Sequence, residues 1–254
     1  MYILVTNDDG VDSEGLLLLK QALSTVGEVT VIAPETNWST ASHLKTLQKP
    51  LRVTRVRMAD GDFAFVTDGS PTDCVSLGVL GITEKKPDLV VAGINKGPNL
   101  GDDVTYSGTV AAAMEGVISG IPSMAVSLDG YFEWDFCFAA DFAARLAAQM
   151  LQNGLGNDVL LNVNVPGLAR EEIKGIEITR LGKRIYRDVL VQKKDSSGRV
   201  HYWIEGEAPT GVPDEGTDYK AVADGKISIT PIHLDLTNHK LIEELRNWDL
   251  RIGS

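Results

Sequence analysis

Short apolar runs alternate with leucine- and alanine-rich segments over about the first two thirds of this 254-residue chain. Strands are predicted at residues 2–6, 28–33, 51–58, 63–66, 88–92, 123–127 and 159–165, and helices at residues 14–26, 70–80, 110–118 and 135–151. The run at residues 2–6 is almost wholly apolar, as expected for a strand covered on both faces of a sheet. The repeated strand–helix order predicts an α/β fold with a doubly wound, mostly parallel sheet.

After these repeats the sequence no longer alternates strand-like and helix-like segments. Residues 186–206 hold two strand-like runs around a polar turn, which predicts a long hairpin. A strand at residues 227–232 and a terminal helix at residues 239–248 follow. We expect a single domain with a core at residues 1–167 and a C-terminal extension at residues 168–254.

Composition excludes several classes of function. The formal net charge is −11 and no run of five basic residues occurs, which disfavours binding to a nucleic-acid polymer. No apolar run approaches the roughly 20 residues of a membrane helix, and the N-terminal segment lacks the features of a signal peptide. We therefore expect a cytoplasmic protein with no membrane partner. Cys74 and Cys137 show no metal-binding spacing, which predicts two reduced cysteines packed near the core.

Two adjacent carboxylates, Asp8 and Asp9, follow the first predicted strand. In an open α/β sheet, ligands bind beyond the carboxyl ends of the strands. Neighbouring carboxylates repel each other unless a positive charge lies beside them, and oxygen ligands favour a hard cation such as Mg²⁺ or Mn²⁺. The alternative is an ordinary turn, because Asn and Asp next to Gly are common turn residues.

Two further features follow later strands. The glycine-rich residues 93–101 place Asn95, with an amide oxygen for a metal, and Asn99, with amide hydrogens for a phosphate. Ser107, Gly108 and Thr109 open a helix whose free N–H groups can bind an anion. Taken alone, the first is better explained as a structural loop and the second as an ordinary serine cap.

Together these features predict a metal held by Asp8, Asp9 and Asn95, with Ser39 as a further candidate ligand, beside a phosphate pocket. Such a metal would make hydroxide available for attack on phosphorus at neutral pH. His43, in the same polar loop as Ser39, is more typical of a surface residue than of a base. The sequence lacks a G-x-x-x-x-G-K-[ST] motif, a G-x-G-x-x-G after the first strand and the second aspartate of a haloacid-dehalogenase-like phosphatase.

Over nearly its whole length the chain resembles the SurE survival-protein family of 5′-nucleotidases. The resemblance lies in residues 3–10, 70–75, 87–110, 112–116, 162–166, 179–182, 217–219 and 227–231. Several distinctive motifs in the same order make it specific.

The resemblance implies a Rossmann-like domain with a C-terminal region used in oligomerisation, as a homodimer or homotetramer. It implies one divalent cation per subunit, Mg²⁺ or Mn²⁺, and hydrolysis of nucleoside 5′-monophosphates, with 3′-monophosphates and short polyphosphate as further substrates. The implied metal ligands are Asp8, Asp9, Ser39 and Asn95. The implied substrate and phosphate contacts are Asn99, Ser107, Gly108, Thr109 and Ser42, and the residues expected to act in catalysis are Asp8, Asp9 and Asn99.

The polar loop at residues 35–49, called the serine loop from here on, departs from the family pattern at residues 38–42. The family reads Arg-Ser-Gly-x-Ser where this chain has Trp38, Ser39, Thr40, Ala41 and Ser42. Both serines are retained, so the metal role of Ser39 is still expected. Trp38 is a candidate to stack on a nucleobase, or equally to pack against the protein itself.

Two other functions are compatible with the same residues. One is a non-catalytic metal- or nucleotide-binding protein that assembles through its C-terminal region. The other is a nucleotide-sugar glycosyltransferase, which also places aspartates near a metal on a Rossmann-like sheet. Hydrolysis of a simple aryl phosphate would separate a phosphatase from both.

Overall fold

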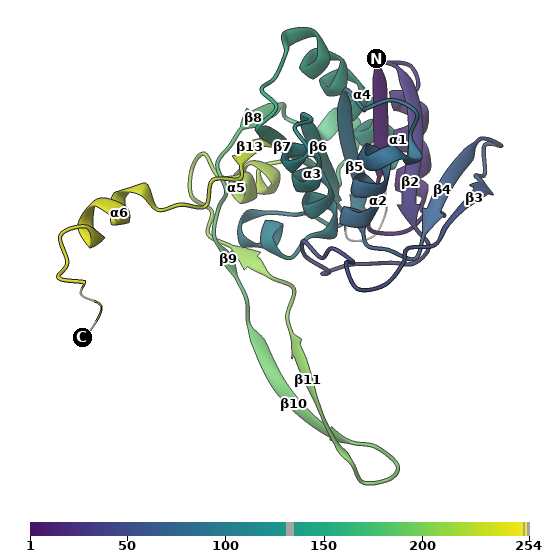
Figure 1. The fold of residues 1–254 in the computed structure, drawn as a ribbon. Helices are drawn as coiled ribbons and strands as arrows, with labels where there is room; N and C mark the ends of the chain where they lie inside the picture. The colour runs from purple at the N-terminus through teal and green to yellow at the C-terminus, as the bar shows by residue number, and fades with distance from the viewer. Residues whose placement is uncertain (131–134, 251, 253–254) are drawn as a thin grey trace.

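A nine-stranded sheet organises the computed structural model, which describes residues 1–130, 135–250 and 252 (Figure 1). Its strands are β1 (Tyr2–Thr6), β2 (Glu28–Pro34), β3 (Val53–Arg57), β4 (Phe63–Thr67), β5 (Leu89–Lys96), β6 (Ser123–Asp129), β7 (Val159–Pro166), β8 (Ile176–Ile178) and β13 (Ile227–His233). The order across the sheet is β3-β4-β2-β1-β5-β6-β7-β13-β8. Strands β4, β2, β1, β5, β6 and β7 run parallel, β3 is antiparallel to β4, and β13 is antiparallel to β7.

The strand order reverses at β1. From β1 the chain first adds β2 and β4 on one side, and then returns to add β5, β6 and β7 on the other. The loops that follow β1 and β5 therefore leave the sheet in opposite directions and open a crevice at its carboxyl edge. The predicted doubly wound, mostly parallel sheet is confirmed.

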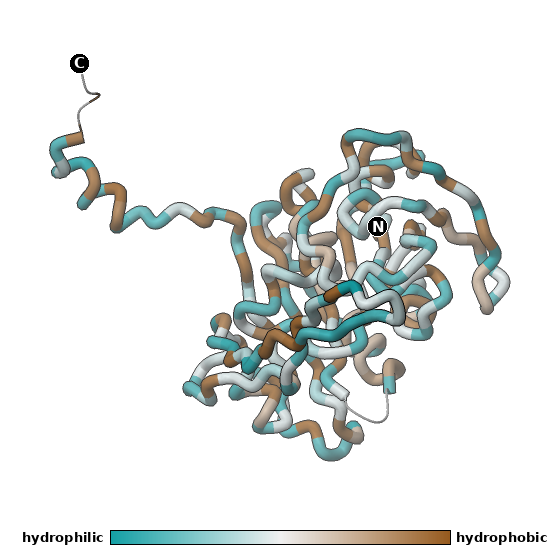
Figure 2. The backbone as a smooth tube through the Cα atoms, turned by 90° about the horizontal axis from the view of Figure 1, so that it is seen from below, coloured by the Kyte–Doolittle hydropathy of each residue, from teal (hydrophilic) through white to brown (hydrophobic). Residues whose placement is uncertain are grey.

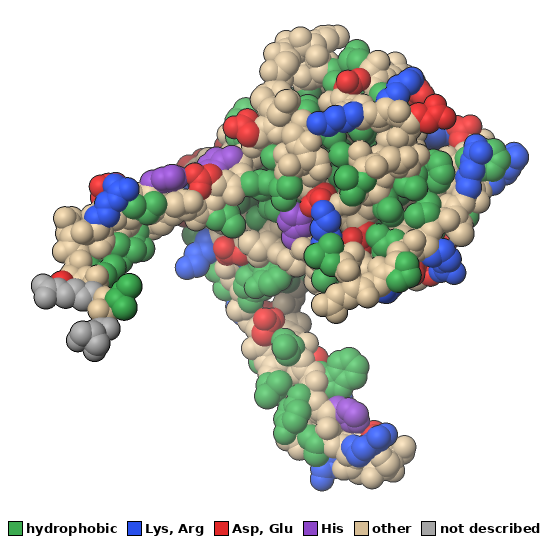
Figure 3. All heavy atoms as spheres, viewed as in Figure 1, with side chains coloured by type: hydrophobic (Ala, Val, Ile, Leu, Met, Phe, Trp, Pro, Cys, Tyr) green, Lys and Arg blue, Asp and Glu red, His purple; other side chains and the backbone are tan. Residues whose placement is uncertain are grey.

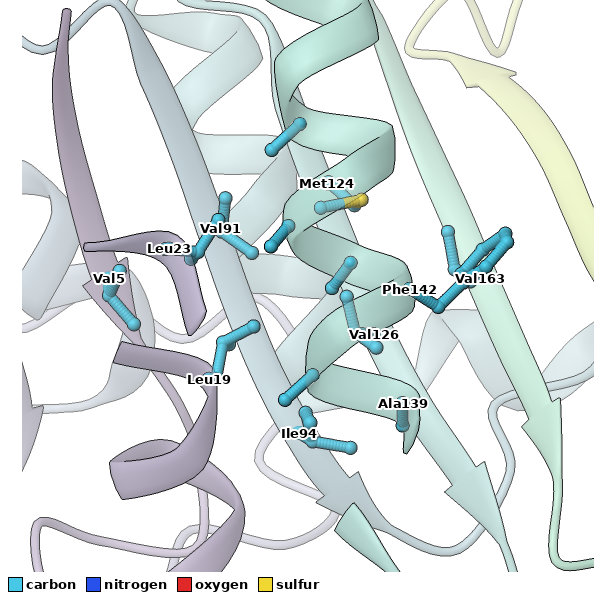
Figure 4. Close-up of a cluster of buried hydrophobic side chains, with 14 of the residues drawn as sticks. Val5, Leu19, Leu23, Val91, Ile94, Met124, Val126, Ala139, Phe142 and Val163 are labelled. Carbon is cyan, nitrogen blue, oxygen red and sulfur yellow. The ribbon is translucent and has the colours of Figure 1, made fainter. Parts of the chain in front are cut away.

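Helices cover both faces of the sheet and divide the core into two layers. Helices α1 (Glu14–Leu23) and α4 (Phe136–Asn153) bury apolar side chains against one face, as Figure 4 shows for Leu19, Leu23, Ala139 and Phe142. Helices α2 (Pro71–Leu77) and α3 (Gly108–Ile118) cover the other face. The remaining helical segments are η1 (Gly78–Ile82), η2 (Gly101–Thr105), η3 (Arg170–Glu172), α5 (Asp218–Ala223) and α6 (His239–Leu245).

Two segments of the C-terminal part project from this body (Figure 1). One is the hairpin of β10 (Asp188–Lys194) and β11 (Val200–Gly206), which pair only with each other in the described sheets. At its base β9 (Arg184–Ile185) pairs with β12 (Thr210–Gly211). The other is the arm that carries α6, on which hydrophilic and hydrophobic residues alternate (Figure 2).

The hairpin is less polar than its turn suggests. Its exposed side chains include Val189, Leu190, Tyr202, Trp203 and Ile204, and apolar side chains gather along it in Figure 3. The cross-strand partners Leu190 and Ile204 share one face, and Val191 and Trp203 share the other. Both faces of the hairpin therefore present apolar surface to solvent.

Several predicted boundaries need correction. The strand predicted to end at Ala92 continues to Lys96, because an irregularity in the β5–β6 register between Ala92 and Asn95 absorbs the glycine that we interpreted as its end. The sequence analysis missed β8, β9, β12 and α5. Cys74 is buried as predicted, but Cys137 lies on the exposed side of α4, so its predicted packing near the core is wrong. No helix in the described ranges is both long and apolar enough to span a membrane.

Candidate functional site

The turn after β1 is built by Asn7. Its side-chain amide donates to the Gly10 carbonyl at 2.9 Å and to the Ser13 hydroxyl at 2.8 Å, while Ser13 caps α1 by accepting from Leu16. Gly10 takes a φ of 101°, which favours glycine. These hydrogen bonds hold the turn at residues 7–10 in a defined conformation at the carboxyl edge of the sheet.

Asp8 is buried beneath the first turn of α3. Its side chain accepts a hydrogen bond from the Thr109 hydroxyl at 2.5 Å. A Cβ on Gly108 would lie only 2.9 Å from the Cβ of Asp8, so glycine permits this approach of helix and carboxylate. Burial and, to a smaller extent, the nearby charge of Asp9 raise the pKa of Asp8 to about 6, although the hydrogen bonds from Thr109 act to lower it.

Asp9 connects β5 to the loop that carries the serines. Its carboxylate accepts from the Lys96 backbone N–H at 3.3 Å and from the Asn37 side chain at 3.2 Å. Burial raises the pKa of Asp9, although Lys96 acts to lower it. The two aspartates therefore lie beside the end of β5 and the start of the serine loop, as the sequence analysis expected.

Asn95 stands at the end of β5, next in sequence to the Lys96 amide that contacts Asp9. Its Nδ2 donates to the Gly97 carbonyl at 2.9 Å, which leaves the amide oxygen as the atom for another partner. An amide oxygen on the Asp9 side of the crevice suits the predicted ligand role.

The serine loop is held in an uncommon backbone conformation. Thr40 and Ser42 have φ values of 62° and 54°, a left-handed region that β-branched residues such as threonine rarely adopt. The exposed Ser39 donates its backbone N–H to Asn37 Oδ1 at 2.7 Å, and Asn37 in turn contacts Asp9. Thr40 therefore keeps the backbone conformation that the family's glycine would supply, and Ser39 stays next to the aspartates.

Ser42 and Trp38 have defined partners in this loop. The Ser42 hydroxyl donates to the Thr105 carbonyl at 2.7 Å, so in this arrangement it can accept but not donate a further hydrogen bond. Trp38 donates its backbone N–H to the Asp8 carbonyl at 2.7 Å. Its side chain is half-buried, and its indole nitrogen is buried without a hydrogen-bond partner among the described residues.

Asn99 rests in a cradle of polar side chains that the sequence analysis did not identify. Its backbone N–H donates to Asn164 Oδ1 and its Nδ2 to the Ser127 hydroxyl, both at 2.8 Å. Its carbonyl accepts from Asn162 at 2.8 Å and from Asn164 at 3.1 Å. The available signal was the pair of asparagines within the otherwise apolar β7, since buried amides need partners.

The start of α3 faces the same crevice. Ser107 caps the helix by accepting from the Val110 N–H at 3.1 Å, which leaves its hydroxyl hydrogen free to donate. Thr109 is committed to Asp8 and thus fixes that carboxylate. The Nε2 of His43 lies 3.1 Å from a carboxylate oxygen of Glu115 on α3, so this ring nitrogen is engaged with α3.

A model of the family described as "Survival protein SurE" matches residues 3–188. The chain belongs to the SurE family. It is 56% identical to a Herpetosiphon aurantiacus protein named 5′-nucleotidase SurE, with 96% of this chain and 97% of that protein covered. Against the 5′-nucleotidase SurE of Chloroflexus aggregans, identity is 50% over 98% of this chain and 99% of the relative.

A solved structure shows the same architecture. The crystal structure of the SurE protein from Aquifex aeolicus matches with a TM-score of 0.83 at 44% identity, covering 97% of this chain and 98% of that one. The predicted SurE resemblance and α/β fold are confirmed. The shared name of the curated relatives agrees with the predicted class of enzyme.

The donor atoms of this SurE site fit a hard divalent cation. Among the residues that the structure describes, no three His, Cys, Asp or Glu side chains form a cluster that could hold a metal ion. A cation here would therefore combine the carboxylates of Asp8 and Asp9 with amide and hydroxyl oxygens, the ligands that Mg²⁺ and Mn²⁺ prefer. The raised pKa of both carboxylates indicates negative charge that the protein alone leaves poorly compensated.

The burial of Asp8 predicts how stability depends on pH in chelator. The folded protein retains a proton on Asp8 up to pH about 6, whereas an aspartate in the unfolded chain loses it near its ordinary pKa of 3.8. Stability should therefore fall as pH rises from about 4 to above 6, by about 3 kcal/mol at most. Urea denaturation of the wild type and Asp8→Asn across this range measures the effect, and the substitution should remove it. Identical pH profiles for the two proteins would contradict this account.

Proposed function

We propose that the chain is a divalent-metal-dependent phosphatase that hydrolyses nucleoside 5′-monophosphates, with 3′-monophosphates and short polyphosphate as further substrates. The observation that carries the proposal is the pair formed by the buried Asp8 and the half-buried Asp9, at the switch point of the sheet beside an amide cradle and a helix N-terminus. The names of the SurE relatives support the choice of substrate.

The residues that would hold one Mg²⁺ or Mn²⁺ per subunit are Asp8, Asp9, Asn95 and Ser39. A bound divalent cation supplies Lewis acidity and lowers the pKa of water. Thr109 keeps the Asp8 carboxylate in a fixed orientation through its hydroxyl. Because Gly108 has no side chain, the start of α3 lies directly against that carboxylate.

The phosphate would lie between Asn99 and the start of α3. Asn99 gives one Nδ2 hydrogen to Ser127, so its second hydrogen is available to a phosphate oxygen. The Ser107 hydroxyl and the N–H of Gly108 add donors on the opposite side, where the helix dipole favours negative charge. Donors that are already fixed by Ser127, Asn164 and the helix stabilise developing charge without reorganisation.

Phosphate release from a panel of nucleoside monophosphates and an aryl phosphate, with chelator and with Mg²⁺ or Mn²⁺ restored, tests the proposal. We expect release that chelator abolishes and metal restores. Asp8→Asn should lower kcat/KM by at least about a hundredfold, since second-sphere changes alone cost 10–100-fold, while the protein stays folded in circular dichroism. No release with either metal would favour the non-catalytic binding protein, and a requirement for a sugar nucleotide would favour the glycosyltransferase.

Trp38 is proposed to contact the nucleobase, because its backbone is bonded to Asp8 and its ring is half-buried beside the crevice. Loss of stacking is worth about 1–3 kcal/mol per base. Trp38→Ala should therefore raise the KM for nucleotides at least fivefold and leave that for an aryl phosphate nearly unchanged. An equal rise for both substrates would instead assign the indole a packing role in the loop.

The hairpin is proposed to join subunits into a homodimer or homotetramer, because both of its faces expose apolar side chains. Leu190→Lys, at a position 69% exposed, places a charge within that surface. Light scattering should show a smaller assembly for this variant. Leu80→Lys, at a position 83% exposed and outside the hairpin, is the matched control and should leave the mass unchanged. A monomeric wild type would contradict the proposal.

A further inference from the structure

A buried glutamate, Glu115, lies outside the groups assigned so far. It belongs to α3, its side chain is 6% exposed, and three side chains converge on its carboxylate. Lys45 Nζ and the Ser76 hydroxyl both donate to Oε1 at 2.7 Å, and His43 Nε2 lies 3.1 Å from Oε2. Burial acts to raise the pKa of Glu115, but the hydrogen bonds from His43, Lys45 and Ser76 lower it to about 2. Glu115 is therefore charged at any pH at which the protein is expected to work.

Two of these partners belong to the serine loop, and the loop follows one face of α3. Gly108 and Glu115 are seven residues apart on the helix, so they lie on the same face, about 10 Å from each other. At Gly108 this face meets the Trp38 carbonyl, which would be 3.3 Å from an added Cβ. At Glu115 it holds His43 and Lys45. The helix that fixes Asp8 thus also fixes the loop.

Helix α2 secures the adjacent part of the loop. The Ser70 hydroxyl donates to the Leu44 carbonyl at 2.5 Å, and the Thr46 N–H donates to the buried Asp73 at 2.9 Å. These contacts do not reach Ser39, which is separated from Leu44 and Thr46 by the strained backbone at Thr40 and Ser42. A left-handed threonine persists only where its surroundings overdetermine it. The anchors therefore have to offset a local tendency of the loop to relax.

We infer that Glu115 is a positioning residue that holds the strained serine loop against α3 through Lys45 and His43, and thereby keeps Ser39 in place as a metal ligand. The inference rests on the proposed metal site, and it goes beyond the predicted ligands because Glu115 touches neither metal nor substrate. Loss of the anchor would allow residues 38–42 to relax and would weaken metal binding.

The test compares Glu115→Gln and Lys45→Met with two controls. Ser76→Ala removes a bond between α2 and α3 without touching the loop, and Glu177→Gln neutralises a glutamate paired with Lys226 far from it in the sheet. Mn²⁺ affinity by electron paramagnetic resonance reads the site without any substrate. Hydrogen exchange in metal-free protein reads the backbone amides of Ser42 and Thr46, which are bonded to Tyr106 and Asp73.

We expect Glu115→Gln and Lys45→Met to weaken Mn²⁺ binding about tenfold, as is typical for residues that orient a metal ligand. The two loop amides should exchange faster, and kcat at saturating metal should stay within about threefold of wild type, because the fully loaded site is the same. Both control variants should bind Mn²⁺ within about twofold of wild type, whereas a merely structural role for Glu115 would make Ser76→Ala and Glu115→Gln alike.

Relief of the strain supplies a rescue. Thr40→Gly allows the left-handed backbone at little cost. Added to Glu115→Gln or Lys45→Met, it should restore most of the lost Mn²⁺ affinity. If Glu115→Gln fails to fold, Lys45→Met with and without Thr40→Gly decides the question.

Three results would overturn the inference: unchanged exchange in both loop variants, faster exchange with unchanged Mn²⁺ affinity, or a wild type that binds no Mn²⁺. A wild type that binds Mn²⁺ but hydrolyses no nucleotide would refute only the proposed activity. The shifts in affinity and exchange would still support the anchoring role of Glu115 in that case.

Discussion

The contact between Asp8 and the first turn of α3 is the constraint on which the rest of the site depends. It brings a buried carboxylate to within hydrogen-bond distance of Thr109, and it is possible only because residue 108 has no side chain. That contact fixes the position of α3 relative to β1, and α3 in turn positions Ser107 and Glu115. The proposed donors for phosphate and the proposed anchor of the serine loop therefore share one rigid element.

Two kinds of polar support surround this contact. On the β6–β7 side, Ser127, Asn162 and Asn164 form hydrogen bonds with Asn99 from within the sheet, so strands carry the loop proposed to bind phosphate. On the β2 side, the serine loop has little apolar burial of its own and depends on hydrogen bonds to α2 and α3. One side of the crevice is thus fixed by the core, and the other by charge-assisted contacts that are easier to loosen.

Much of the fold could be predicted because its signals are local. The strand at residues 2–6 and the Ser70 cap of α2 follow from short patterns, and the placement of Asp8 and Asp9 follows from the rule that ligands meet the carboxyl ends of parallel strands. The cradle around Asn99 was missed because it joins residues that lie 28 to 65 positions apart, and neither segment alone predicts how they pair across the sheet. The left-handed backbone at Thr40 could not be predicted either, because threonine rarely adopts that conformation.

The chain at residues 168–254 was predicted as a C-terminal extension that includes a strand at residues 227–232. In the structure, β13 pairs with residues 159–164 of β7 and separates β7 from β8. Until residues 227–233 have been synthesised, β7 has an unpaired edge, and this is the strand that carries Asn162 and Asn164. The support for Asn99 is consequently assembled from segments that leave the ribosome far apart in time. The carboxylates come from residues 8 and 9, but the strand that completes the sheet around the loop proposed to bind phosphate comes from residues 227–233.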